Sequence, residues 1–303
     1  MFTRPFRFER AGTLADACAM LRRHGEGAKV IAGGQSLMPL VNLGLAQPEV
    51  VIDISRAGSG PDAGAGSGPD AGAREISAAD GYLHIGALVT HARLAADPAA
   101  ARLQPLLGAA AGSIGNPRVR NRGTLGGSLA HGDPAAELPL VMVALGASYQ
   151  ITDGRRPRQA RAEEFHLGYL TTGLADDELI AAARVPVLGP GWGWSFHEVS
   201  RRDGDFALAA VAALVRIADG IVVESRVAAG GVADRPVRLA DVEIALSGAS
   251  PGEIGARLDG VGPLRGIRPV SDTAASAGYR ARLCRVLVGR ALAEASARSL
   301  AAA

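Results

Sequence analysis

The sequence predicts an α+β protein of two domains, with the second domain beginning near residue 176. Two observations predict this class. The first sixty residues alternate between helix, strand, glycine-bearing loop and strand, whereas the last third consists of long strands followed by helices. A chain of 303 residues is long enough for two domains, each with its own core.

Composition excludes several classes of function. The formal charge is only +2, which gives no basis for a nucleic-acid surface or an anionic membrane partner. No run of eighteen apolar residues could form a spanning helix, and Met1–Phe6 lacks the apolar core of a secretory signal. The cysteines Cys18 and Cys284 are far apart, so we expect no disulfide framework, iron–sulfur ligands or metal site. A cytoplasmic location is the resulting expectation.

The N-terminal elements are indicated by caps and by apolar spacing. Thr13 can cap a helix that ends near Gly25, and strands are expected at Lys29–Ala32 and Val50–Ile54. The octapeptide AGSGPDAG then occurs twice in tandem, over residues 57–72. Its turn-forming composition predicts a flexible hairpin loop at 57–73, which divides a first domain, 1–175, into subdomains of about 1–56 and 74–175.

Further along the chain, paired strands are expected at 74–77 and 82–87, followed by a helix at about 99–112 and an irregular stretch at 114–127. Residues 138–145 are almost continuously apolar and should be buried. In the second domain, 176–303, strands are expected at 195–199, 207–217 and 222–229, with a turn at Asp219-Gly220 between the last two. Helices are expected at about 251–258 and 274–302.

Two glycine-bearing segments could carry the chemistry. Ala32-Gly33-Gly34-Gln35-Ser36-Leu37 follows a strand, and Gly123-Thr124-Leu125-Gly126-Gly127-Ser128 follows a basic run. Neither is a Rossmann or Walker motif. Both offer successive backbone N–H groups that no Cβ obstructs, which is the equipment for binding a pyrophosphate, and three hydroxyl groups could assist. Each loop alone could equally be an ordinary tight turn.

Taken together, longer segments carry a family resemblance. AGGQSLMPLVNLGLAQPEVVIDI (32–54) and IGNPRVRNRGTLGGSLAHGDPAAELPLVMVALGA (114–147) resemble the two signature segments of the FAD subunits of molybdenum hydroxylases, the xanthine dehydrogenase and aerobic carbon monoxide dehydrogenase family. FHEVSRRDGDFALAAVAA (196–213) resembles the start of that family's C-terminal domain. The resemblance implies the two-subdomain FAD-binding fold of the vanillyl-alcohol oxidase (PCMH) type, followed by a small α+β domain.

The same resemblance implies a set of cofactor contacts. Main-chain groups of the first loop would bind the FAD diphosphate, the second loop would close on it, and Ile114 would touch the flavin or adenine. Glu137, where relatives usually carry Asp, would bind sugar hydroxyls, Leu179 and Ile180 would lie beside the adenine, and Phe196 would lie over the isoalloxazine ring. The expected FAD-binding residues are Lys29, Ala32, Gly33, Gly34, Gln35, Ser36, Leu37, Ile114, Thr124, Gly127, Ser128, Glu137, Leu179, Ile180 and Phe196.

Lys29 is the only lysine among 32 basic residues. Its position at the entrance to the first loop leads to the hypothesis that its ammonium pairs with the diphosphate, although a solvated surface residue is an equal alternative.

The function implied by the resemblance is electron transfer by a bound FAD. Electrons would arrive from [2Fe–2S] clusters on a small partner subunit, after hydroxylation at a molybdopterin centre on a large one, and would leave to an external acceptor. The complex would be a dimer of such heterotrimers, and no catalytic acid, base or nucleophile is needed on this chain. A free-standing FAD-dependent oxidase of the same fold is the alternative, and a protein that has lost its flavin is a weaker one.

Overall fold

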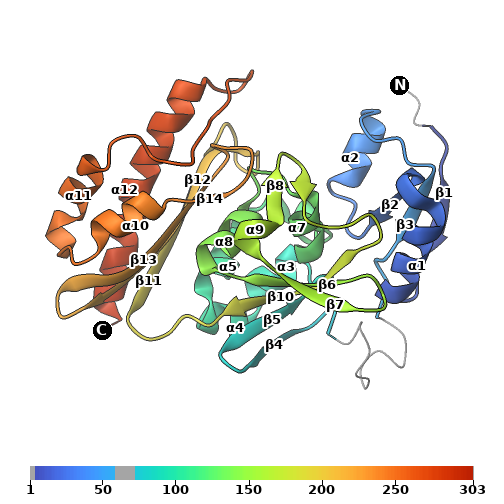
Figure 1. The fold of residues 1–303 in the computed structure, drawn as a ribbon, viewed down its shortest axis with the longest axis horizontal. Coiled ribbons are helices and arrows are strands. Elements are labelled where there is room, and N and C mark those ends of the chain that lie inside the picture. Colours follow the sequence, from blue (N-terminus) through green and yellow to red (C-terminus); the bar gives the residue numbers. More distant parts are fainter. Residues whose placement is uncertain (1–3, 59–71, 303) are drawn as a thin grey trace.

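The computed structural model describes residues 4–58 and 72–302, and within them the chain forms three bodies arranged in a row (Figure 1). The N-terminal subdomain lies at one end, a central sheet with its helices in the middle, and the C-terminal domain at the other end. Most of the tandem octapeptide, for which the sequence predicts a flexible loop, lies outside the described residues. The expected hairpin is wrong, because the strands on either side of it belong to different sheets.

The N-terminal subdomain is a parallel three-stranded sheet in the order β1-β3-β2, packed against helix α1. Thr13 caps α1 with a reciprocal capping box to Asp16, as its sequence position predicts, and Gly25 ends the helix. The elements are β1 (Arg7–Arg10), α1 (Leu14–His24), the short 3₁₀ turn η1 (Gly25–Gly27), β2 (Ala28–Ile31), α2 (Leu37–Asn42) and β3 (Val50–Asp53).

The central subdomain contains a five-stranded antiparallel sheet in the order β4-β5-β10-β6-β7. Its helices bury the largest apolar cluster of the protein, and α8 is buried along most of its length. The strands are β4 (Ile76–Ala79), β5 (Tyr82–Gly86), β6 (Ser148–Thr152), β7 (Pro157–Arg161), β8 (His166–Gly168), β9 (Thr171–Thr172) and β10 (Leu179–Pro186). The helices are α3 (His91–Ala96), α4 (Pro98–Leu103), α5 (Pro105–Ser113), α6 (Pro117–Arg120), α7 (Leu125–His131), α8 (Glu137–Leu145) and α9 (Ala162–Phe165).

Two sequence expectations for this subdomain need correction. The single helix expected at 99–112 is two helices, because Pro105 cannot continue the first one and instead opens α5. The stretch expected to be irregular, 114–127, contains α6 and the first turn of α7, which the caps Asn116 and Thr124 begin.

The C-terminal domain is an antiparallel sheet, β11-β12-β13-β14, with its helices on one face and the central subdomain against the other (Figure 1). Its elements are β11 (Trp192–Ser200), β12 (Ala207–Ala218), β13 (Ile221–Gly230), β14 (Val237–Arg238), α10 (Ala240–Leu246), η2 (Pro251–Glu253), α11 (Ile254–Gly260) and α12 (Ala277–Ala301). The turn at Asp219-Gly220 has positive φ at both residues, as its sequence predicts. Buried Cys284 packs in the core of this domain.

The boundary between the domains follows from strand pairing. β10 pairs with β5 and β6 of the central sheet, so residues 179–186 are part of the first domain's architecture. We therefore propose a boundary between β10 and β11, in place of the one expected at residue 176.

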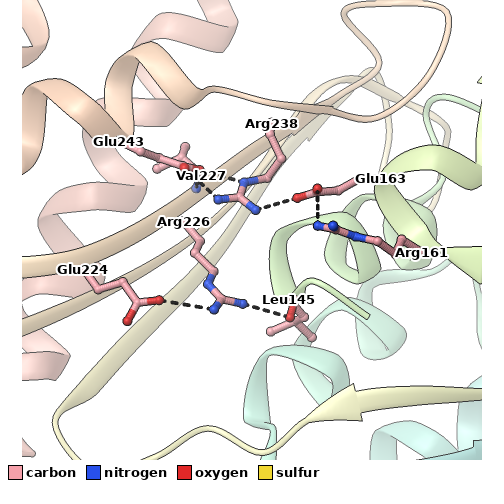
Figure 2. A network of polar contacts seen from close by, with 8 residues as sticks. All are labelled: Leu145, Arg161, Glu163, Glu224, Arg226, Val227, Arg238 and Glu243. Atoms are coloured by element: carbon pink, nitrogen blue, oxygen red, sulfur yellow. Dashed lines mark hydrogen bonds and ion pairs between the residues drawn. The ribbon is translucent and has the colours of Figure 1, made fainter. Parts of the chain in front are cut away.

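A polar network joins the C-terminal domain to the central subdomain (Figure 2). Arg238 donates two hydrogen bonds to the carboxylate of Glu243 in its own domain. Its Nη1 donates a third to Glu163 Oε1 of the central subdomain, at 2.6 Å. Arg226 donates to the carbonyl oxygen of Leu145 at the end of α8, at 3.1 Å. These contacts, together with the packing of α8 on β12 and β13, fix one domain on the other.

Candidate functional site

The two glycine loops lie on opposite sides of one cleft, where the N-terminal and central subdomains meet. The cleft has a volume of about 530 Å³, within the range of about 300–1,000 Å³ usual for cofactor and small-molecule sites. Of the residues expected to bind FAD, all but Phe196 line it.

The first loop presents a row of unpaired backbone donors. Within the described residues, no protein group accepts a hydrogen bond from the backbone N–H of Gly34, Gln35, Ser36 or Leu37. Gly34 has a φ of +75°, a conformation that favours glycine, and it turns the chain from β2 into α2. Consecutive free N–H groups beside a cleft are suited to binding an anion such as a diphosphate.

The second loop differs from the sequence expectation, because its own fold uses its backbone donors. The N–H groups of Leu125 and Gly126 bond to carbonyl oxygens of Val89 and Ala87, and the N–H of Gly127 bonds to the Thr124 hydroxyl. Thr124, Gly126, Gly127 and Ser128 of this loop line the cleft, and the Thr124 hydroxyl, which accepts from Gly127, still has its own proton to donate. The two loops are therefore not equivalent.

The loops also contact each other directly. A Cβ placed on Gly33 would lie 2.0 Å from the carbonyl oxygen of Arg122, and Arg122 Nε donates to the carbonyl oxygen of Gly33 at 3.4 Å. Only glycine allows this approach, so Gly33 is what permits the backbones of the two cleft walls to come into contact.

His91 supports the second loop and was missed by the sequence analysis. Its ring is buried, and its Nε2 lies 3.0 Å from the carbonyl oxygen of Thr124. Burial lowers the pKa of His91 to about 4, so the ring is neutral at pH 7 and Nε2 carries the proton that it donates. No short-range pattern in the sequence links His91 to a loop thirty residues later.

Two acidic residues that follow α7, Asp133 and Glu137, line the cleft, and Glu198 lies near enough to Glu137 to act on its ionisation. Burial first, and then the negative charges of Glu198 and Asp133, raise the pKa of Glu137 to about 7. Burial likewise raises the pKa of Glu198, on β11, to about 7.

Lys29, by contrast, is exposed on β2 where that strand borders the cleft, and its ammonium has no acidic partner within the described residues.

Phe196 is the one expected FAD-binding residue that does not line the cleft. Residues alternate across β11, so Ser195 and His197 face α12, while Trp194 and Phe196 pack against the core of the central subdomain. The aromatic residue of this hairpin that lines the cleft is Phe206.

A cleft with a row of free backbone donors and apolar walls is of the kind that holds a phosphate-bearing cofactor. Comparison with known proteins gives the particular family. The model of the FAD binding domain in molybdopterin dehydrogenase matches residues 4–59 and 71–188, and that of the CO dehydrogenase flavoprotein C-terminal domain matches 194–295. The chain therefore belongs to the family of FAD-binding medium subunits of carbon monoxide dehydrogenase and related molybdenum hydroxylases.

Individual relatives agree over nearly their whole length. The nicotine 6-hydroxylase medium subunit of Paenarthrobacter nicotinovorans is 37% identical over 97% of this chain and 98% of that protein. The carbon monoxide dehydrogenase medium chain of Afipia carboxidovorans is 32% identical over 97% and 98%. A solved carbon monoxide dehydrogenase from Hydrogenophaga pseudoflava superposes with a TM-score of 0.90 at 33% identity, covering 98% of this chain and 99% of that one.

These comparisons confirm the predicted fold, an FAD-binding domain followed by a C-terminal flavoprotein domain, and they confirm FAD as the cofactor and an oxidoreductase subunit as the class. No helix among residues 4–58 and 72–302 is both long and apolar enough to cross a membrane.

Proposed function

We propose that this chain holds FAD non-covalently in the cleft and passes electrons from [2Fe–2S] clusters of a partner subunit to an external acceptor. The observation that carries the cofactor's placement is the row of four free backbone N–H groups, from Gly34 to Leu37, in residues that line a cleft of cofactor size. An FAD diphosphate supplies the acceptor oxygens that these donors lack.

The remaining residues fit the rest of the molecule. Ser36, Thr124 and Ser128 offer hydroxyl groups beside the diphosphate, while Gly127 keeps the second wall flat. Leu37, Ile114, Leu179 and Ile180 are apolar surfaces for an aromatic ring. Glu137, buried at the N-terminal end of α8, can hydrogen-bond a sugar hydroxyl in either protonation state, since a hydroxyl both donates and accepts.

Bound flavin supplies the redox chemistry, because it can accept single electrons from clusters and deliver two to an acceptor. The chain's contribution is placement: it binds the diphosphate, orients the ring and excludes water from part of the cleft. No side chain needs to move a proton to a substrate, so we assign no catalytic residue.

The partners follow from the relatives, which are medium subunits by name. We infer a large molybdopterin subunit and a small [2Fe–2S] subunit, assembled as a dimer of heterotrimers in the cytoplasm. The four cysteine ligands of a [2Fe–2S] cluster are not present in this chain, which has only Cys18 and Cys284, both buried and in different domains.

Purification from the native host through a tag on this chain tests the proposal. The expected result is a complex of three polypeptides that contains FAD, molybdenum and iron–sulfur clusters. Substrate added to this complex should reduce the clusters and the flavin. Isolation of the chain alone, with FAD that an organic substrate reduces directly, would overturn the electron-transfer role and establish a free-standing flavin oxidase or dehydrogenase instead.

A further inference from the structure

One histidine of the cleft has no bonding partner for its ring. His131, the last residue of α7, is half-buried and lines the cleft. Within the part of the chain that the structure describes, its ring makes no hydrogen bond or ion pair, and the same holds for His84, which lies outside the cleft lining. The other four histidines each have a ring nitrogen within 3.3 Å of another polar group; they are His24, His91, His166 and His197. The ring nitrogens of His131 are therefore available to an occupant of the cleft.

His131 lies at the end of the cleft where the C-terminal domain meets it. In the proposed function the diphosphate lies at the start of α7, and the seven residues of this helix rise about 10 Å from there to His131, at ~1.5 Å per residue. Just beyond, the carbonyl oxygen of Pro134 accepts from the N–H of Gly231, which directly follows β13, at 2.8 Å. This contact places the end of the cleft beside the second domain.

The ionisable side chains of the cleft indicate which part of FAD this end receives. Among the described residues, those that line the cleft are Lys29, His91, His131, Asp133 and Glu137. Lys29 precedes the first loop and His91 is bonded to the second, whereas the other three lie together after α7. Perturbed ionisable groups concentrate where a site performs its chemistry. Electron transfer changes the charge of the isoalloxazine ring and leaves adenine unchanged, so we assign this end to the isoalloxazine ring.

The surroundings of His131 keep its ring neutral until a further negative charge arrives. Burial lowers its pKa below the usual 6.5, against the attraction of the nearby Asp133 carboxylate. Asp133 is held in place, because its Oδ1 accepts from the N–H of Ala135 at 2.8 Å. A second negative charge close to His131 would raise its pKa, since an opposite charge favours the protonated imidazole.

The elements packed against α7 bring no competing positive charge to this end. α8 brings Glu137, and Glu198 on β11 acts on that carboxyl group. β9 consists of two threonines. β5 and β10 carry His84 and Arg184, but these residues alternate with core residues and so lie on the outer face of the sheet, away from the helices. Within the described residues, His131 is thus the side chain at this end that can become positive near neutral pH.

We propose that His131 takes up a proton when the bound flavin is reduced, and that its positive charge balances the negative charge that reduction leaves on the isoalloxazine ring. Two electrons arrive from the partner's clusters, one solvent proton binds N5 of the ring, and a second solvent proton binds a ring nitrogen of His131. Both protons return to solvent when the two electrons leave to the acceptor. This inference rests on the proposed placement of FAD and on its proposed role as an electron carrier.

The second proton makes the midpoint potential of FAD depend more strongly on pH. His131 has a lower pKa beside oxidised flavin and a higher pKa beside reduced flavin. Between these two values reduction binds one further proton. Protonated His131 therefore favours reduction at the lower end of this pH window, and the effect is lost as pH rises through the higher pKa.

Spectroelectrochemical titration of the purified, FAD-containing complex from about pH 6 to about pH 8 tests this proposal. The midpoint potential of the wild type should fall with pH about twice as steeply as that of His131→Asn, because two protons accompany the two electrons in place of one. Near pH 6 the potential of the variant should lie below that of the wild type. His84→Asn is the matched control, since it removes the other histidine without a ring partner, and it should follow the wild type.

His131→Gln, which also cannot ionise in this range, should behave as His131→Asn does. Equal pH dependence in the wild type and in either FAD-containing His131 variant would overturn the proposal. A weaker pH dependence in Glu137→Gln, with none in the His131 variants, would also overturn it, because the carboxyl group would then be the proton acceptor. Wild-type complex without FAD would instead overturn the proposed function itself.

Discussion

At Glu137, burial opposes ionisation. Because burial raises its pKa from 4.5 to about 7, the folded protein binds more protons than the unfolded chain between those two values. The contribution of this carboxyl group is therefore greatest below pH 4.5 and is lost as pH rises toward 7. We predict that Glu137→Gln raises the free energy of unfolding of the FAD-free protein by ~1–2 kcal/mol at pH 7.5, with little change at pH 4.5.

Chemical denaturation of variant and wild type at both pH values checks this. The quantity to compare is the difference in unfolding free energy between variant and wild type at each pH. The stability of the wild type alone would mislead, because His91 changes stability with pH in the opposite direction. Its pKa falls from 6.5 to about 4, so the folded state binds fewer protons in that range and gains stability as pH rises. An equal stability difference at pH 4.5 and 7.5 would contradict the assignment.

Lys29 has the exposure of a solvated residue and the position of a ligand contact. If its ammonium pairs with the diphosphate, Lys29→Ala should raise the Kd for FAD about ten-fold at low salt, and by less at high salt. Lys29→Arg should restore only part of the affinity. Titrations at two ionic strengths measure this, and wild-type affinity for Lys29→Ala at low salt would remove Lys29 from the site.

Single residues also show where sequence reasoning stops. The two glycine-bearing loops could be predicted from the sequence, because a tight turn requires glycine at particular positions of the turn itself. The sequence does not show that Phe206 lines the cleft and Phe196 does not, because the face that Phe196 occupies depends on how β11 pairs and packs.

At the scale of elements, the glycines of the two loops act in different ways. A side chain at Gly33 would collide with the backbone of the second loop, whereas one at Gly127 would meet only the Thr124 hydroxyl, at 2.9 Å. We predict that Gly33→Val lowers both Tm and FAD affinity, and that Gly127→Val lowers FAD affinity by at least ~10-fold with a smaller loss of Tm.

Gly112→Ala in α5 is the control for these variants, because nothing lies within 4 Å of the added Cβ. Thermal melts and FAD titrations of the three proteins are the measurement. If Gly127→Val bound FAD as tightly as the wild type, the second loop would be an ordinary turn.

Elements with local signals were predictable. Thr13 begins α1 and Gly25 ends it, and Asp219-Gly220 forms the turn of a hairpin, as expected. The missed elements are short and depend on distant partners. β6 and β7, for example, pair beside β10, whose partners are far away in the sequence.

At the scale of the whole molecule, the C-terminal domain is held by half-buried charges (Figure 2). The carboxylates of Glu243 and Glu163 raise the pKa of Arg238 against the effect of burial. We predict a coupling energy of about 1–2 kcal/mol between Glu163 and Arg238, from a double-mutant cycle with Glu163→Gln and Arg238→Met. Urea unfolding of the four proteins measures it, and additive single effects would mean that the pair does not join the domains.

The three-body arrangement was only partly predictable. The change from alternating elements to a long hairpin with helices indicated two domains. Two features could not be predicted: β10 pairs within the central sheet, and β3 and β4, on either side of the octapeptide, belong to different sheets. Both depend on pairing between strands that are distant in sequence.

The central claim is that this cleft holds FAD without a covalent bond. Acid precipitation of the purified flavoprotein, followed by measurement of flavin in supernatant and pellet, tests it most directly. The account predicts one FAD per chain, all of it in the supernatant, and a large loss of FAD in Gly127→Val. Flavin that stays with the pellet, or the absence of flavin from the wild-type protein, would contradict it.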